Sequence, residues 1–243
     1  MIRKILLSII IPTWNEEKYL PRLLECIKRQ TYKNYEIIVA DANSKDKTKQ
    51  IARKYGCGVV KGGMPAVGRN NGARIAKGSI LLFLDADVII KKDFFVKAIK
   101  ELQQRNLQVS GCYLVPDSKN VLDIIGHKIL NLWFFLMQYV YPHMVGQCIF
   151  STKSIHKKLK GFDTTILFAE DNDYVNRSKK FCKFRILHSV RITASTRRFE
   201  NENRFVLMLK YFLCPFYRMI FGEIRRNIFK YSLGSLETRV DNK

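Results

Sequence analysis

The sequence predicts an α/β fold with a mostly parallel central sheet that is flanked by helices. Two observations lead to this prediction. Short apolar runs alternate with amphipathic segments of helical period through the first half of the chain, and a cluster of polar residues follows most of the runs. Alternation of this kind places helices on both faces of one sheet. The 243 residues are enough to bury a core as one domain with an appended segment.

The elements of the first half follow from apolar spacing. Strands are expected at residues 6–13, 35–41, 58–61, 79–84 and 109–115. Helices are expected at residues 20–27, around Ile51, at 66–76 and at 94–102. Ser44 precedes the second of these helices and is expected to cap it, because serine side chains accept hydrogen bonds from free helix amides.

The pattern changes from about residue 120. Residues 121–141 form a long aromatic segment with helical period, and residues 146–151 and 184–190 are expected to return as strands. A polar segment occupies residues 163–177. The tail at 205–231 mixes aromatic and aliphatic residues with lysine and arginine.

Asp85 and Asp87 follow the expected strand at 79–84, whose continuous apolar sequence indicates burial on both faces. Open α/β sheets bind ligands beyond the carboxyl ends of their strands. Two carboxylates this close repel each other unless a cation compensates them, and their oxygens suit a hard divalent ion. The pair predicts a metal–diphosphate site. The alternative is an exposed turn, in which aspartate is common.

Three other polar clusters are expected at the same edge of the sheet. They are residues 12–17, residues 41–44 and residues 68–72. Each cluster alone is typical of a turn or a helix cap. Their convergence on one edge predicts a functional site.

These four segments resemble the motifs of family 2 glycosyltransferases of the GT-A fold. The resemblance is carried by SIIIPTWNE at 8–16, VADANSKDKT at 39–48, GRNNG at 68–72 and DAD at 85–87, in order over roughly residues 5–115. It implies an inverting enzyme that moves a sugar from a nucleotide-diphosphate sugar, such as a UDP- or GDP-sugar, to an acceptor hydroxyl or phosphate.

The resemblance also implies roles for single residues. The residues expected to border the nucleotide base are Pro12, Thr13, Asn15, Glu16 and Asp41. Arg69 is expected to lie against the nucleotide, and Asp85 to bind the ribose or support the metal. Asp87 is the expected ligand of Mg²⁺ or Mn²⁺, an ion that neutralises charge on the departing diphosphate.

The acceptor half of the reaction needs a base for the acceptor hydroxyl. Residues 161–163 and 169–173 resemble the acceptor-side segment of the family, which implies that Asp171 is the base and Glu170 its positioning partner. The alternative for Glu170 and Asp171 is an acid-rich helix start, and Asp173 is the competing base. Arg197 and Arg198 lie in a segment that resembles a membrane-associated branch of the family, and the paired arginines could bind phosphate. A solvated basic turn is the alternative.

The resemblance implies a GT-A catalytic domain at residues 1–200, with a donor half at 1–115 and an acceptor half at 116–200. A basic amphipathic tail follows at 201–243. The family's Q-x-x-R-W segment is absent, so processive polymerisation is not expected. A nucleotidyltransferase would more often carry a glycine-rich loop near the first strand. A sugar-nucleotide-binding protein without catalysis could dispense with Glu170 and Asp171.

The chain is strongly basic, with 43 Lys and Arg against 21 Asp and Glu and a net charge of +22. No helix-turn-helix, zinc or RNP-like pattern supports binding to nucleic acid. Residues 121–145 and 205–230 combine apolar and basic residues in the manner of helices that lie in an anionic membrane surface. The acceptor is then expected to be a glycan or a polyprenyl-phosphate-type lipid. Packing on the core or a homodimer contact is the alternative.

Six cysteines are scattered without metal-binding spacing and are expected to be reduced thiols. The first apolar run ends in PTWNEE without a small-residue cleavage site, and no apolar stretch reaches the length of a spanning helix. The expected location is therefore the cytoplasm, at the periphery of the membrane.

Overall fold

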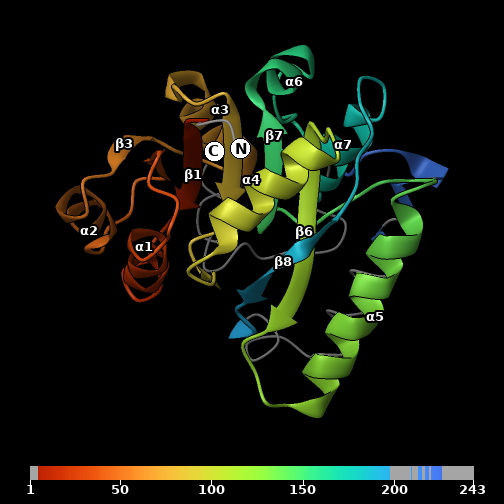
Figure 1. The fold of residues 1–243 in the computed structure, drawn as a ribbon, viewed down its shortest axis with the longest axis horizontal. Helices are drawn as coiled ribbons and strands as arrows, with labels where there is room; N and C mark the ends of the chain where they lie inside the picture. Colours follow the sequence, from red (N-terminus) through yellow and green to blue (C-terminus); the bar gives the residue numbers. More distant parts are fainter. Residues whose placement is uncertain (1–4, 198–208, 210–212, 215–216, 219, 226–243) are drawn as a thin grey trace.

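The computed structural model describes residues 5–197, 209, 213–214, 217–218 and 220–225. One eight-stranded sheet runs through the described chain in the order β3-β2-β1-β4-β7-β6-β8-β5 (Figure 1). The strands are β1 Leu7–Thr13, β2 Tyr35–Asp41, β3 Gly58–Lys61, β4 Ile80–Leu84, β5 Val88–Ile89, β6 Val109–Pro116, β7 Cys148–Thr152 and β8 Leu187–Ala194.

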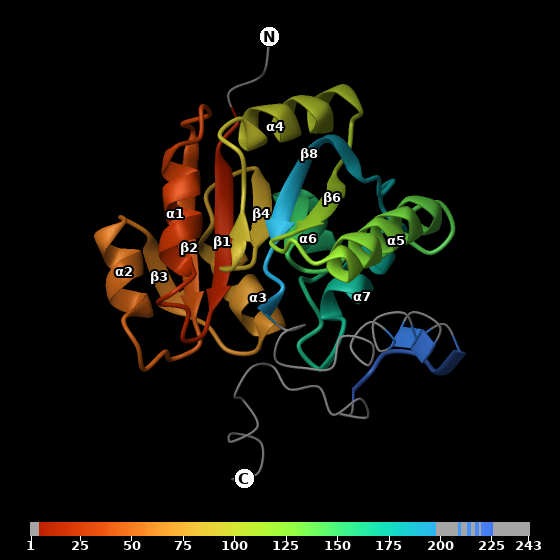
Figure 2. The same cartoon turned by 90° about the horizontal axis from the view of Figure 1, so that it is seen from below.

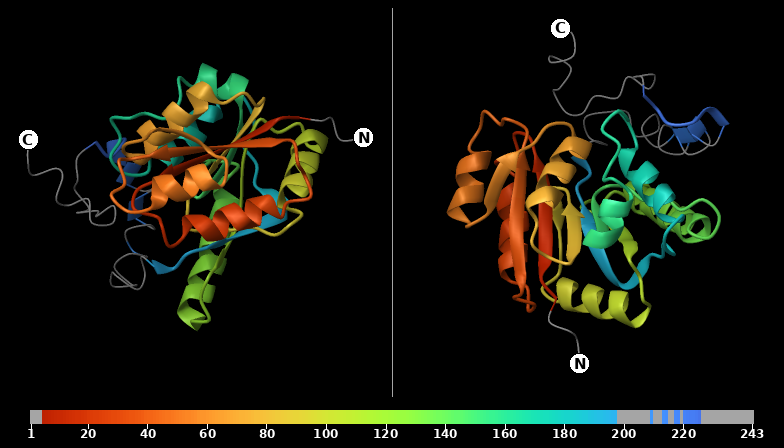
Figure 3. Two further views of the ribbon diagram at one scale, coloured as in Figure 1. Left: turned by 90° about the vertical axis from the view of Figure 1, so that its left-hand side faces the viewer. Right: turned by 90° about the horizontal axis from the view of Figure 1, so that it is seen from above.

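Helices cover both faces of the sheet, as the alternation predicted. The helices are α1 Leu20–Lys28, α2 Thr48–Lys54, α3 Pro65–Ile75, α4 Phe94–Gln104, α5 Val121–Met137, α6 Lys153–Lys158 and α7 Glu170–Ser178. Helices α3, α6 and α7 lie on one face, and α1 lies on the other (Figures 2 and 3). The predicted α/β architecture with flanking helices is confirmed.

The pairing of the strands brings the predicted clusters to one edge. Strands β1, β2, β3 and β4 are parallel, and Thr13 of β1 lies opposite Asp41 of β2. Strand β7 runs antiparallel to both β4 and β6, while β8 runs parallel to β6. The sheet is therefore mixed in its second half. Asp85 directly follows the last residue of β4.

The centre of the sheet is fully buried. The ends of its strands therefore hold the connecting loops in place. Every residue of β4 is buried, and Leu82 and Phe83 have no exposed surface. Helix α3 packs closely on β1, because a Cβ atom at Gly72 would lie 2.5 Å from Cγ2 of Ile10. Burial on both faces explains the continuous apolar sequence of these strands.

Three expectations about local structure need correction or restriction. Helix α2 starts at Thr48, and Ser44 does not cap it, because its hydroxyl bonds the carboxylate of Asp41 instead. Strand β8 spans Leu187–Ala194 rather than the expected 184–190, and Phe184 makes only an isolated bridge to Val109 before it. Most of the tail at 205–231 lies outside the described residues.

All six cysteines are free thiols, as expected. Within the described part of the chain, none of the helices combines the length and the apolar character that crossing a bilayer requires.

Candidate active site

The loops after β1 and β2 are locked together at the edge of the sheet. Asp41 is buried, and its carboxylate accepts hydrogen bonds from the Thr13 hydroxyl at 3.1 Å and from the hydroxyl and amide of Ser44 at 2.5 and 2.9 Å. The amide of Asn15 donates to the Ser44 hydroxyl at 2.9 Å. These bonds make a rigid edge that begins at Pro12, near the end of β1. The Asp41 carboxylate thus already accepts three hydrogen bonds from its own chain.

The same edge includes Asn15 and Glu16. Asn15 has a left-handed backbone, with φ of 52°, and its side chain accepts a hydrogen bond from the amide of Lys45. The amide of Glu16 donates to the hydroxyl of Thr48 at 2.8 Å. The five residues predicted to border the base therefore lie together, at the paired ends of β1 and β2 and in the loop that follows β1.

Arg69 joins the acid that follows β4 to the acid that begins α7. Its side chain is almost fully buried, and its guanidinium lies 3.0 Å from Asp85 Oδ1 and 2.6 Å from Glu170 Oε1. Although burial alone lowers the pKa of Arg69, the carboxylates of Asp85, Glu170 and Asp171 raise it above its ordinary value. Arg69 is therefore a fixed cation that contacts Asp85, 16 residues away in the sequence, and Glu170, 101 residues away.

Asp171 lies beside this network with an unusual proton affinity. Burial and the neighbouring charge of Glu170 raise its pKa to about 7, while Arg69 acts in the opposite direction. Its Oδ2 accepts a hydrogen bond from the amide of Gly146, and its Oδ1 accepts one from the amide of Asn172 at 2.7 Å. A general base works best when its pKa is near the working pH. The carboxyl group of Asp171 fits that role.

The carboxylate of Asp173 is used in an ion pair within its own helix. It is buried in α7, and its carboxylate binds Arg177 at 2.7 Å within the same helix. Arg177 in turn donates to the carbonyl oxygens of Leu159 and Gly161. Asp173 is therefore neither capping α7 nor solvated, and its position favours Asp171 as the base.

Arg197 connects the first loop to the metal motif. Its guanidinium binds Glu16 through two hydrogen bonds of 2.9 and 2.7 Å, and its Nε lies 3.1 Å from Asp87 Oδ2. The same group stacks on the ring of Tyr19 at 4.6 Å. Arg197 is thus placed among the predicted donor residues. Arg198 lies outside the described residues.

The residues at the end of β4 suit a divalent cation that shares its shell with a substrate. Asp85 and Asp87 supply hard oxygen ligands, and each is paired with an arginine rather than with the other. Among the described residues, no group of three or more His, Cys, Asp or Glu could hold a metal. Mg²⁺ is commonly bound by one or two carboxylates together with phosphate oxygens, so the donor set fits a cation completed by a diphosphate.

Three contributors to the site were not predicted. Gly146 binds Asp171 through its amide, Asn70 clasps the amide and carbonyl of Phe162 at 2.8 Å each, and Tyr19 supports Arg197. Asn70 lies inside the GRNNG motif, which was the available signal. Gly146 contributes only its backbone amide, so the amino-acid sequence held no signal that pointed to it.

Replacing Gly146 with alanine is expected to lower activity by about tenfold or more and to destabilise the fold by about 1–3 kcal/mol. The added Cβ would collide with the Arg69 guanidinium and lie 3.0 Å from Asp171 Oδ2. Turnover and the midpoint of urea unfolding measure the two effects. Gly58→Ala is the matched control, because its nearest contact is an ordinary 3.7 Å. Wild-type behaviour of Gly146→Ala would contradict the close packing described above.

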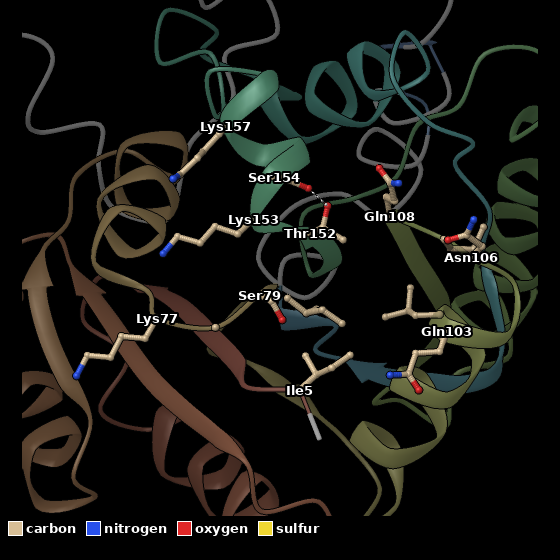
Figure 4. Close-up of a pocket in the computed structure, with 14 residues that line it drawn as sticks. Ile5, Lys77, Ser79, Gln103, Asn106, Gln108, Thr152, Lys153, Ser154 and Lys157 are labelled. Carbon is tan, nitrogen blue, oxygen red and sulfur yellow. Dashed lines mark hydrogen bonds between the residues drawn. The ribbon is translucent and has the colours of Figure 1, made fainter. Parts of the chain in front are cut away.

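A separate hollow lies at the opposite edge of the sheet. It has a volume of about 720 Å³, and its lining includes Lys77, Lys153 and Lys157 (Figure 4). Ile5, Ser79 and Gln108 also line it, and these residues precede β1, β4 and β6. The hollow is therefore at the amino ends of the parallel strands and is distinct from the acidic site.

Comparison with known proteins agrees with the four motifs. A family model described as "Glycosyl transferase family 2" matches residues 8–162. The uncharacterized glycosyltransferase EpsJ of Bacillus subtilis is 24% identical over 188 residues, which cover 70% of this chain and 54% of EpsJ. The 4,4'-diaponeurosporenoate glycosyltransferase of Staphylococcus haemolyticus is 37% identical over 160 residues, covering 62% of this chain and 40% of the relative. The chain thus spans about half the length of these relatives or less.

Solved structures share the fold. S. aureus TarS 1–349 in complex with UDP superposes with a TM-score of 0.64 at 20% identity, covering 84% of this chain and 65% of the TarS 1–349 chain. The Pyrobaculum calidifontis mannosyltransferase PcManGT in complex with GDP-Man and Mn²⁺ superposes with a TM-score of 0.66 at 19% identity. The match covers 88% of this chain and 67% of the PcManGT chain. These similarities confirm the predicted GT-A fold. Together with the family match over residues 8–162, they show that the chain belongs to glycosyltransferase family 2.

Proposed function

We propose that the protein is an inverting, metal-assisted glycosyltransferase that uses a nucleotide-diphosphate sugar. The observation that carries the proposal is the buried Arg69, which joins Asp85 at the end of β4 to Glu170 beside Asp171. One cation thereby holds the donor-binding acid and the acceptor-side acids in a fixed arrangement. Residues 1–115 would bind the donor, and residues 116–200 would supply the acceptor side.

The chemistry follows from the position of Asp171. Its carboxylate takes the proton of the acceptor hydroxyl as the oxygen attacks the anomeric carbon of the sugar. The bond from that carbon to the diphosphate oxygen breaks, and the configuration inverts. The backbone amides of Gly146 and Asn172 hold the Asp171 carboxylate, and the charges of Glu170 and Arg69 adjust its proton affinity. A phosphate acceptor is already ionised and would not need a base.

Asp87 and Asp85 would hold the divalent cation, Mg²⁺ or Mn²⁺. When bound, the ion neutralises charge on the departing nucleoside diphosphate. Arg197 lies against Asp87 and Glu16, where its guanidinium could add bidentate contacts to phosphate oxygens. The structures of TarS with UDP and of PcManGT with GDP-Man and Mn²⁺ support a UDP- or GDP-sugar donor and a bound metal.

The acceptor is proposed to be a glycan or a polyprenyl-phosphate-type lipid. The net charge of +22 supports association with an anionic membrane, and we propose a peripheral location on its cytoplasmic face. Long-range attraction of this kind concentrates a basic protein at a lipid surface without a spanning segment.

Product identity tests the proposed reaction. The protein is incubated with UDP-, GDP- and dTDP-sugars and Mn²⁺ or Mg²⁺, and the released nucleotide is measured. Release of a nucleoside diphosphate with one donor is the expected result. Release of a sugar 1-phosphate would indicate a nucleotidyltransferase, because transfer of the nucleotidyl group breaks the bond between the two phosphates. Binding without turnover would indicate a non-catalytic sugar-nucleotide-binding protein.

Asp87→Asn is expected to weaken metal-dependent donor binding by roughly tenfold or more, because the amide is a poorer ligand than the carboxylate. Titration of donor binding with and without metal measures the effect. Asp93→Asn is the control, since Asp93 forms a surface ion pair with Lys97. Unchanged metal dependence in Asp87→Asn would refute the ligand assignment.

A further inference from the structure

Helix α5 presents an apolar face to solvent. Ile129, Leu132 and Leu136 are 59%, 58% and 54% exposed. Leu122 and Ile125 precede them at the same spacing of three or four residues, so these five residues line one side of the helix. We call these five residues the apolar stripe. Contiguous exposed apolar patches on soluble proteins mark interaction sites.

The orientation of α5 is fixed by contacts on its opposite side. The amide group of Asn131 accepts from the Leu114 amide at 3.0 Å and donates to the Leu114 carbonyl at 2.7 Å. Phe134 is buried, and the indole of Trp133 donates to His143 at 2.8 Å. The helix therefore cannot turn the apolar stripe inward. Figure 3 shows α5 projecting from the rest of the domain.

A cluster of cations adjoins the carboxyl-terminal end of α5. Residues 179–185 read KKFCKFR, with four cations and no acid, and we call them the basic segment. Arg185 stacks on Tyr139 at 4.5 Å, and Lys179 lies 5.6 Å from the ring of Tyr141. Phe181 is 49% exposed in the middle of the segment. The acid of α5, Asp123, is buried and accepts a bond from Ser118.

We propose that the apolar stripe and the basic segment dock on the surface of an anionic phospholipid bilayer. Apolar side chains beside lysine and arginine match the boundary between acyl chains and anionic headgroups. A second copy of the chain fits less well. Each copy carries a net charge of +22, so pairing two copies would bring two like-charged proteins together.

The docking surface also lies close to the candidate base. Helix α7 starts at Glu170 and ends at Ser178, immediately before the basic segment. Nine helical residues span about 13 Å, so the bilayer surface and Asp171 would flank one short helix. A lipid-linked acceptor could then reach Asp171 from the membrane, a consequence that rests on the proposed function.

The test is sedimentation of the full chain with vesicles of phosphatidylcholine, with or without phosphatidylglycerol. We expect binding to the anionic vesicles that weakens with salt. Replacing Lys179, Lys180 and Lys183 with serine is expected to lower the partition coefficient by about 100-fold, at roughly fivefold per lysine. Replacing Ile129, Leu132 and Leu136 with glutamine is expected to lower it by about tenfold or more.

The control variants carry the same kinds of substitution at other places on the surface. Lys28, Lys92 and Lys100 are replaced together with serine, and exposed Ile75 is replaced with glutamine. Equal losses in these controls, or no binding of the unaltered chain, would overturn the proposal. So would a dimer in solution that the glutamine variant converts to a monomer, since the stripe would then be a dimer contact. Repeating the assay with Asp171→Asn keeps docking separate from catalysis, because that variant should bind vesicles normally.

Discussion

Asp171→Asn is expected to lower sugar transfer by about 10²- to 10⁴-fold while leaving donor binding unchanged. The substitution removes the proton acceptor but keeps the size of the side chain and an oxygen that can accept from the Gly146 amide. Steady-state transfer and donor titration measure the two quantities. Asn172→Ala, next to the base but without a carboxylate, is a control for local disturbance. Transfer that persists in Asp171→Asn would eliminate Asp171 as the base.

The same residue predicts a pH dependence. Because the pKa of Asp171 is raised to about 7, the active carboxylate is lost as the pH falls below that value. We expect kcat/KM to rise with pH through about 7 in the wild-type protein. A profile that stays flat down to about pH 5 would show that the group titrates normally.

The free energy of unfolding should change with pH in the direction opposite to that of kcat/KM. The pKa of Asp171 is higher in the folded chain than its ordinary 3.8, so the folded state retains a proton that the unfolded state has lost. The free energy of unfolding therefore falls as the pH rises from about 4 to about 7. Asp171→Asn is expected to be more stable than the wild type at neutral pH, and this advantage should vanish near pH 4. Catalytic groups often carry such a cost.

Arg69→Met is expected to destabilise the protein by about 3–5 kcal/mol, because it leaves Asp85 and Glu170 without their buried cation. Urea unfolding measures the loss. Arg22→Met is the matched control, since the ion pair of Arg22 with Asp117 is exposed at 55% and 43%. A pair of that kind contributes less than about 1 kcal/mol.

Arg69 should also set the proton affinity of Asp171. Its charge lowers the pKa of Asp171 against the effects of burial and Glu170, so its removal is expected to shift the rise of activity to higher pH. Arg69→Lys keeps the charge and should restore part of the profile. If Arg69→Met folds with wild-type stability and an unshifted profile, Arg69 does not link the acids as the geometry indicates.

The sequence predicted the sheet because its strands are buried on both faces. Residues 79–84 could be assigned from their apolar content alone, and β4 is indeed entirely buried. The edge cluster was also predictable, because parallel strands place their carboxyl ends together. Ser44 was assigned wrongly, since the rule for helix caps does not account for the carboxylate of Asp41, three residues earlier at the end of β2, which accepts the Ser44 hydroxyl instead.

The sequence by itself determined the fold class, through the periodicity of its apolar residues, and the family, through four ordered motifs of residues close in the chain. Only the tertiary structure decided which groups that are distant in the sequence come into contact. Arg69 contacts Glu170 over 101 residues, and Arg197 contacts Glu16 over 181. The raised pKa of Asp171 and the outward face of α5 likewise depend on burial and packing, which are properties of the folded surface rather than of any local pattern.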